Sequence, residues 1–83
     1  MKILYFAWLR QKTGVGEEEV TLPDNVATVG ELVDWLAARG PGYAEALSDR
    51  GALRIAVNQE YAKESDPVAQ GDEIALFPPV TGG

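Results

Sequence analysis

The feature that most constrains this chain is the absence of both cysteine and histidine from its 83 residues. No disulfide and none of the usual zinc sites can staple the fold, so a domain this small has to hold by packing alone. Hydrophobic residues make up 46% of the sequence and charged ones 24%, the balance of a folded globular domain. The same absence excludes Ser–His and Cys–His catalysis. We therefore expect one small domain that depends on a partner for acid–base groups.

The charge balance is acidic, with 7 basic against 13 acidic side chains and a formal net charge of −6. Such a chain lacks the cationic excess that neutralises phosphates, so we expect protein partners and no nucleic acid. The carboxylates show no EF-hand spacing, and no metal site is predicted. The longest apolar run, residues 3–9, is far shorter than the ~20 residues of a membrane helix, and basic residues follow it where a secretion signal needs small ones. We expect a cytoplasmic protein with no membrane segment.

The hydrophobic pattern predicts secondary structure along the whole chain. Residues 1–9 are predicted to form a strand whose odd positions face the core, followed by a hairpin turn at 13–16 and a strand over 17–22. The spacing of Thr28 and Glu31 is that of a capping box. It opens a predicted helix, which ends at Gly40 and Pro41 and whose apolar stripe comprises Val29, Leu32, Val33 and Leu36.

The second half of the chain predicts a short helical segment over residues 43–47, strands over 53–57 and 73–77, and a short strand around Tyr61. This order predicts an α+β fold with a mixed sheet of four to five strands and one main helix packed across one face. The first strand is expected in the centre of the sheet, with the last strand beside it. The folded domain is expected to span residues 1–77.

Residues 78–83, Pro-Pro-Val-Thr-Gly-Gly, form a predicted tail with unusual reach. The two prolines stiffen its exit from the sheet, and six extended residues span up to about 20 Å. The two glycines have no Cβ atoms, so they can pass through a narrow channel in another protein. The tail then presents a free α-carboxylate at Gly83.

The segment G-D-E-I-A-L-F-P-P-V-T-G-G, residues 71–83, resembles the C-terminus of the MoaD/ThiS family of ubiquitin-like sulfur carriers. The order of elements also resembles the family's β-grasp fold. The resemblance implies that an adenylating enzyme of the ubiquitin-activating type uses ATP to form an acyl-adenylate at Gly83. A sulfur donor, such as a cysteine desulfurase or a rhodanese-like protein, then converts it to a thiocarboxylate. No cofactor is expected to stay bound to the chain.

The resemblance further implies that this sulfur goes to cyclic pyranopterin monophosphate during molybdenum cofactor biosynthesis. The large subunit of molybdopterin synthase would take up the tail, which is made of Pro78, Pro79, Val80, Thr81 and Gly82 ahead of Gly83. In that role the chain is a cosubstrate, and the active site belongs to the large subunit.

An apolar surface is predicted on the sheet face away from the helix. The even positions Leu4, Phe6 and Trp8 are uncharged, and Ala75 and Phe77 share a face of the last strand. These side chains are either ordinary sheet residues or, as the resemblance implies for Phe6 and Phe77, a docking patch for the adenylating enzyme and the large subunit. We predict that Leu4, Phe6, Ala75 and Phe77 bind partners, with Tyr61 as a candidate at the border. Two cations, Arg10 and Lys63, are either solvated or pair with acidic groups of a partner.

Three alternatives to a molybdopterin carrier remain open from the sequence. The same terminus would serve a sulfur carrier for thiamine or for tRNA thiolation, or a ubiquitin-like protein modifier. A β-grasp binding module without a reactive terminus is the third alternative. The Pro-Pro-Val-Thr segment before the two glycines favours the molybdopterin branch, because thiamine carriers of the family are shorter and lack the diproline.

Overall fold

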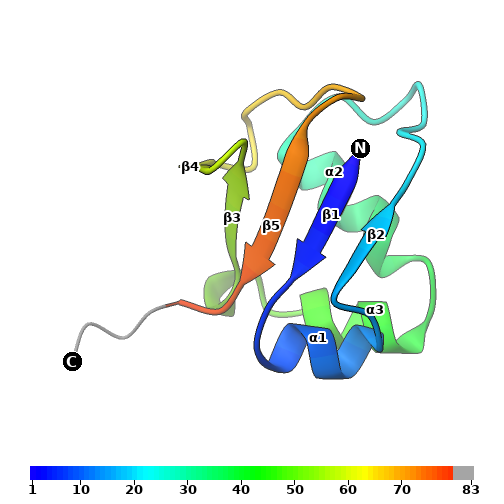
Figure 1. Cartoon of the computed structure of the whole chain (residues 1–83), viewed down its shortest axis with the longest axis vertical. Coiled ribbons are helices and arrows are strands. Elements are labelled where there is room, and N and C mark those ends of the chain that lie inside the picture. The colour runs from blue at the N-terminus through cyan, green and yellow to red at the C-terminus, as the bar shows by residue number, and fades with distance from the viewer. Residues whose placement is uncertain (80–83) are drawn as a thin grey trace.

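A computed structural model describes residues 1–79 and shows one mixed sheet backed by helices (Figure 1). The strands are β1 (Lys2–Tyr5), β2 (Glu17–Glu19), β3 (Arg54–Val57), β4 (Glu60–Tyr61) and β5 (Glu73–Phe77). Their order across the sheet is β2-β1-β5-β3-β4. β1 and β5 run parallel, and the other three pairs run antiparallel. This is the predicted α+β, β-grasp arrangement, although β5 and not β1 is the middle strand.

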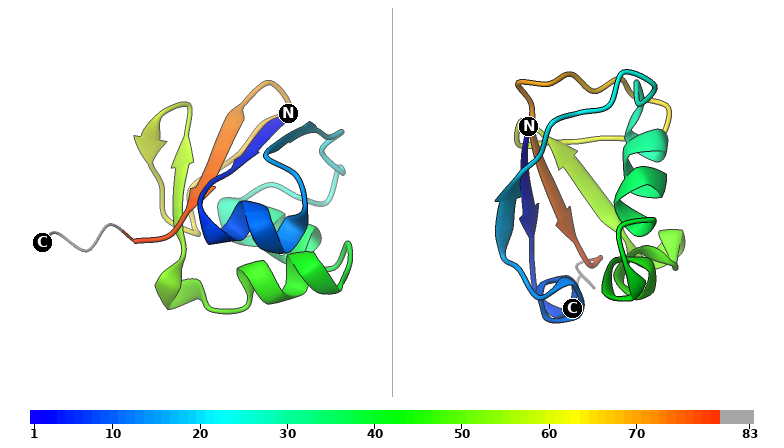
Figure 2. Two further views of the ribbon diagram at one scale, coloured as in Figure 1. Left: turned by 60° about the horizontal axis from the view of Figure 1, so that its bottom comes forward. Right: turned by 90° about the vertical axis from the view of Figure 1, so that its right-hand side faces the viewer.

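The main helix, α2 (Val29–Ala37), lies across one face of the sheet, and two short helices close one end (Figure 2). These are α1 (Trp8–Thr13) and α3 (Pro41–Leu47), and a 3-10 turn, η1 (Arg50–Ala52), leads into β3. Pro41 occupies the first turn of α3, where its missing N–H costs nothing. It therefore begins a helix as well as following one.

The predicted capping box and apolar stripe of α2 are both confirmed. The Thr28 hydroxyl accepts from the Glu31 amide at 3.3 Å, and the Glu31 carboxylate accepts from the Thr28 amide at 3.1 Å. All four stripe residues, Val29, Leu32, Val33 and Leu36, are fully buried. They pack against the sheet face that carries Ile3, Tyr5, Ile74 and Leu76, which are buried as well.

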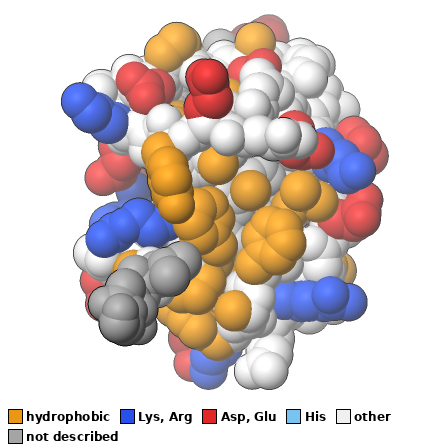
Figure 3. All heavy atoms as spheres, turned by 60° about the vertical axis from the view of Figure 1, so that its left-hand side comes forward, with side chains coloured by type: hydrophobic (Ala, Val, Ile, Leu, Met, Phe, Trp, Pro, Cys, Tyr) orange, Lys and Arg blue, Asp and Glu red, His pale blue; other side chains and the backbone are white. Residues whose placement is uncertain are grey.

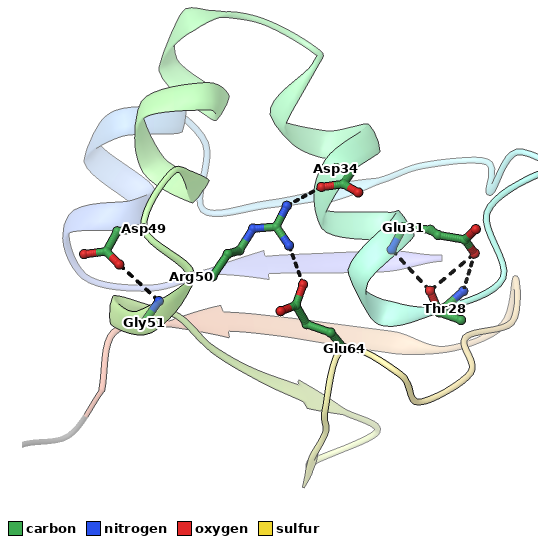
Figure 4. A network of polar contacts seen from close by, with 7 residues as sticks. All are labelled: Thr28, Glu31, Asp34, Asp49, Arg50, Gly51 and Glu64. Atoms are coloured by element: carbon green, nitrogen blue, oxygen red, sulfur yellow. Dashed lines mark hydrogen bonds and ion pairs between the residues drawn. The ribbon is translucent and has the colours of Figure 1, made fainter.

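The polar side of α2 is tied to the loop after β4 through Arg50 (Figure 4). Its guanidinium pairs with Asp34 on α2 and with Glu64, whose carboxylate lies 2.5 Å away. The Glu64 carbonyl also accepts from the Gly30 amide at 2.9 Å. Residues 63–66 are thereby held on the helix side of the sheet.

The prediction of one strand over residues 1–9 is wrong beyond Tyr5. The last ladder bond runs from the Phe6 amide to the Leu76 carbonyl, and Pro78 and Pro79 on the neighbouring strand have no N–H to continue the pairing. The chain turns at Ala7, which has a φ of 55° and is exposed, and continues as α1. Leu9 still reaches the core, but from a helix that covers the end of the sheet.

The predicted hairpin between the first two strands is also wrong, because α1 lies between them. The turn predicted at residues 13–16 is the end of α1, where Gly14 takes a left-handed φ of 83° and its amide bonds to the Arg10 carbonyl. The following strand stops at Glu19 and not at residue 22. Val20 and Met1 still exchange two bonds, from the Val20 amide to the Met1 carbonyl and from the Met1 amino group to the Val20 carbonyl, and the pairing of the two segments ends there. Gly42 brings α3 close to α1, because a Cβ atom there would lie 2.3 Å from the Lys12 carbonyl oxygen.

A half-buried carboxylate links the sheet to the segment that joins α2 to α3. Glu18 on β2 accepts from Tyr5 at 2.7 Å and from Tyr43 at 3.2 Å, and it pairs with Arg39 at 2.7 Å. The Arg39 guanidinium also lies over the Tyr43 ring, 4.9 Å from its centroid. Burial opposes the charge on Glu18, but the hydrogen bonds and the positive charge of Arg39 lower the pKa of this carboxyl. The cluster thus favours ionised Glu18 in the folded state.

We predict that Glu18→Gln lowers stability at neutral pH by about 2 kcal/mol, the scale of hydrogen bonds to a charged group. A carboxyl with a lowered folded pKa stabilises the protein above its unfolded pKa, and this contribution is lost as the pH falls through the folded value. The gap between wild type and variant should therefore shrink below about pH 4. Urea unfolding at several pH values measures it, with exposed Glu17→Gln as the control. A gap that is independent of pH would contradict the role of the charge.

Candidate functional site

The sheet face opposite α2 carries a continuous apolar surface. Across the strands, Leu4 lies opposite Ala75, Ala75 opposite Ala56, and Ala56 opposite Tyr61. Phe6, just after β1, is the next residue on this face after Leu4, and Phe77 at the end of β5 is the next after Ala75. We call these six residues the open face. Figure 3 shows hydrophobic side chains gathered there, with basic and acidic side chains around them.

Two aromatic side chains dominate the exposure of the open face. Phe6 is 47% exposed and Tyr61 is 77% exposed. The Tyr61 and Phe77 rings contact each other with centroids 5.8 Å apart at 54°. Large apolar side chains in contact and open to water on a small domain are typical of an interaction surface.

The structure brings the four residues predicted to bind partners, Leu4, Phe6, Ala75 and Phe77, onto this one face. Their role in binding partners stays a prediction. Trp8 is the exception among the predicted apolar neighbours, because it lies on α1 and not on the sheet. Ala56 was missed, although the predicted inward positions 53, 55 and 57 left it pointing outward.

A shallow hollow adjoins the open face beside β2. It has a volume of about 470 Å³ and is lined by Leu4 and Phe6, by Arg10 from α1, and by Val15 and Glu17. Glu17 pairs with Lys2 at 3.5 Å. The Arg10 side chain instead lies against Gly16, where an added Cβ atom would come within 2.9 Å of its guanidinium carbon. The hollow therefore combines an apolar wall with an exposed cation.

The chain leaves the sheet at the open face. β5 ends at Phe77, as predicted, and half-buried Pro78 and Pro79 follow it. The remaining predicted tail residues, Val80, Thr81, Gly82 and Gly83, lie outside the described residues. A partner seated on the open face would cover the point where this tail begins.

Groups with shifted pKa values lie away from the open face. Burial, with the hydrogen bond to Glu18, raises the pKa of the Tyr5 hydroxyl well above its usual value, and burial with the Glu18 charge raises that of Tyr43. Backbone hydrogen bonds at the start of α2 lower the pKa of the Glu31 carboxyl. Tyr5 faces the core, and Glu31 serves the capping box. On residues 1–79, the open face is therefore equipped to bind and not to transfer protons.

Two further features bear on the kind of site. Within residues 1–79, no three carboxylates come close enough together to hold a metal ion. Of the helices formed by these residues, none is long and apolar enough to cross a membrane.

Comparison with known proteins identifies relatives that span the whole chain. The family model named ThiS family matches residues 3–83. The molybdopterin synthase sulfur carrier subunits of Escherichia coli and Haemophilus influenzae are 42% and 41% identical, and each match covers 100% of this chain and 99% of the relative. The small archaeal modifier protein 1 of Haloferax volcanii is 40% identical over 65 residues, which cover 72% of this chain and 75% of the relative.

Solved structures agree with the sequence comparison. The crystal structure of the Haloferax volcanii modifier SAMP1 superposes with a TM-score of 0.74 at 35% identity, covering 100% of this chain and 98% of that one. A Helicobacter pylori structure of a complex between subunits 1 and 2 of molybdopterin-converting factor matches with a TM-score of 0.65 at 25% identity. That match covers 99% of this chain and 96% of the other.

We predict that Phe77→Asp changes stability by only about 1 kcal/mol, because the side chain points away from the core. Its neighbour Leu76 is fully buried, so Leu76→Asp places a charge in the core and should unfold the domain at room temperature. Circular dichroism melting of the two variants measures the contrast. Comparable destabilisation by both changes would show that the two faces of β5 are misassigned.

Proposed function

The chain belongs to the ThiS family, and from this premise we propose that it is the sulfur carrier subunit of a molybdopterin synthase. Two full-length relatives above 40% identity bear that name. The observation that carries the proposal furthest is the position of the open face at the base of a tail that ends in Gly-Gly. A protein that binds the face receives the tail at the same time.

The proposed chemistry uses the terminus of the chain as the reacting group. A carboxylate is a poor electrophile, so a carboxylate oxygen of Gly83 first attacks the α-phosphate of ATP and pyrophosphate leaves. A sulfur nucleophile then attacks the acyl carbon of the adenylate, and AMP leaves. Where the nucleophile is sulfide, the product is a Gly83 thiocarboxylate. Where it is the persulfide of a donor protein, the product is an acyl disulfide, and a thiol then attacks the donor's sulfur, which releases the thiocarboxylate and forms a disulfide. The chain needs no histidine or cysteine for these steps, because its partners supply the acid–base groups and the sulfur.

Three partners follow from this chemistry. An adenylating enzyme of the ubiquitin-activating type forms the acyl-adenylate, and a cysteine desulfurase or rhodanese-like protein supplies sulfur. The large subunit of molybdopterin synthase takes up Pro78, Pro79, Val80, Thr81 and Gly82 and directs the thiocarboxylate to cyclic pyranopterin monophosphate. Two carriers supply the two dithiolene sulfurs. The use of ATP assigns the reaction to the cytoplasm, with residues 1–77 as the docking domain and 78–83 as the reactive tail.

A ubiquitin-like modifier is the second candidate function. It is supported by the 40% identity to an archaeal modifier protein over 65 residues. Both functions begin with the activated terminus. In the carrier a sulfur nucleophile attacks the acyl carbon, whereas in the modifier the amine of a lysine side chain attacks it. Intact-mass analysis of protein from cells separates them. A carrier gains one sulfur in place of one oxygen, whereas a modifier appears in covalent conjugates.

We predict that changes at the terminus abolish thiocarboxylate formation. Adding one residue after Gly83, or deleting Gly83, moves the reacting carbon by about 3.5 Å, and a misplacement of ~1 Å can cost on the order of 100-fold in rate. Gly82→Val should fail as well, because a branched side chain needs room in a narrow channel. The assay combines each variant with the adenylating enzyme, ATP and a sulfur source, and follows AMP release and product mass.

The control for these variants is thermal stability. The sheet ends at Phe77, so all three should melt with the wild type. An extended protein that reacts at the wild-type rate with its extension still attached would refute the carrier function.

We also predict that Phe77→Asp weakens binding of the large subunit by about 2–4 kcal/mol, because it puts a charge into a desolvated apolar contact. Ala38→Asp makes the same charge change at the exposed C-cap residue that follows α2 and should leave affinity within about 1 kcal/mol. Isothermal titration calorimetry measures both. Equal affinities for the two variants would remove the open face from the interface.

A further inference from the structure

The cations of this acidic chain fall into two groups. Lys2, Lys12, Arg39 and Arg50 each pair with at least one carboxylate. Arg10, Arg54 and Lys63 have no ion-pair partner among residues 1–79. Since acidic side chains outnumber basic ones 13 to 7, three cations without an ion-pair partner within residues 1–79 call for an explanation.

Two of the three flank the open face at the end where the chain leaves the sheet. Arg54 on β3 lies opposite Phe77 on β5 and shares its face. Arg10 lies on the other side of Phe6, in the hollow next to β2 and against Gly16, whose carbonyl accepts from the Tyr5 amide. The line across this end of the sheet thus reads Arg10, Phe6, Phe77, Arg54.

The opposite end of the same face is acidic. There the sheet register sets Lys2 on β1 between Glu19 on β2 and Glu73 on β5. Glu17 lies opposite Leu4, nearer the tail, and its negative charge is paired with Lys2. Glu19 pairs with the N-terminal amino group at 3.9 Å, so Glu73 is the carboxylate at this end without an ion-pair partner among residues 1–79. The open face is therefore polarised, with free positive charge beside the start of the tail and a free negative charge at the far end.

We propose that Arg10 and Arg54 orient the carrier on its partner by meeting acidic groups on either side of the opening that admits the tail. The occupant is a protein surface with an apolar centre, carboxylates at the mouth of its channel and cations at the other end. This proposal rests on the proposed function for the existence of such a partner. Complementary charge at a rim fixes the register of docking and speeds encounter, which an apolar centre alone does not do.

The backbone holds Arg54 in this position. Its guanidinium donates to the Gly51 carbonyl at 3.2 Å and to the Leu53 carbonyl at 3.1 Å, both backbone acceptors that leave its charge unneutralised. Lys63 offers a matched control. It is exposed and has no ion-pair partner among residues 1–79, and the carbonyl of its neighbour Glu64 accepts from the Gly30 amide at the start of α2.

The test is the rate of association between the full chain and the isolated large subunit. We expect the double variant Arg10→Glu/Arg54→Glu to associate on the order of ten-fold more slowly than wild type near 0.05 M salt. The difference should disappear near 1 M salt, where charges are screened beyond about 3 Å. Lys63→Glu should stay within about two-fold of wild type. Arg54→Lys keeps the charge and should associate like wild type, even if the loss of its backbone bonds lowers the melting temperature.

The outcomes separate this proposal from the proposed function. If the double variant associates as fast as Lys63→Glu at low salt while wild type still transfers sulfur, the orienting role is wrong and the carrier function stands. If association depends on the arginines but wild type transfers no sulfur, the carrier function fails and the orienting role stands. If wild type does not bind the subunit at all, both are overturned.

Discussion

The parallel pairing of β1 with β5 is the interaction on which the rest of the structure depends. One register sets Ile3 opposite Ile74 and Tyr5 opposite Leu76, and these four side chains form the sheet side of the core. The same register sets Leu4 opposite Ala75 on the other face. Because side chains alternate along a strand, the pairing that builds the core also builds the open face. A slip of one residue would exchange the two surfaces.

The pairing also fixes where the chain can go at each end. A parallel pair needs a long connection between its strands, and here that connection contains α1, α2, α3 and three further strands. The tail begins where β5 ends, next to the point where β1 gives way to α1. With no disulfide available, the long connections are tied back by side chains, Glu18 to Tyr5 and Tyr43, and Arg50 to Asp34 and Glu64.

The elements that sequence alone predicted are those whose signals are local. The capping box and stripe of α2, and the alternation of β5 before two prolines, are complete within a dozen residues. The break after Tyr5 could not be predicted in this way, because apolar residues continue at the odd positions 7 and 9. What ends β1 is the loss of hydrogen-bonding partners on β5, which is more than 60 residues away in sequence. Local pattern carries no information about that loss.

The candidate site was likewise predictable from sequence only where the signals were local. Alternation, together with the expected pairing of the first and last strands, sufficed to predict Leu4, Phe6, Ala75 and Phe77 on one face away from the helix. Ala56 and Arg54 joined them only through the register between β3 and β5, which no local signal specifies. The polarity of the open face is likewise a property of the assembled sheet. It arises because residues far apart in sequence, such as Arg10 and Arg54, come to the same end.

This arrangement separates recognition from reaction within 83 residues. Binding surfaces benefit from rigid support, and the open face is built on four strands, β1, β5, β3 and β4. The opposite sides of β1 and β5 are packed against α2. The reacting group of the proposed function is the carboxylate of Gly83, six residues after the end of β5 in sequence. A change on the open face can therefore alter which partner binds without altering the acyl chemistry at Gly83. In the proposed function, the adenylating enzyme and the synthase both bind this face. Such sharing requires successive and not simultaneous binding, because a surface this small accommodates one partner at a time.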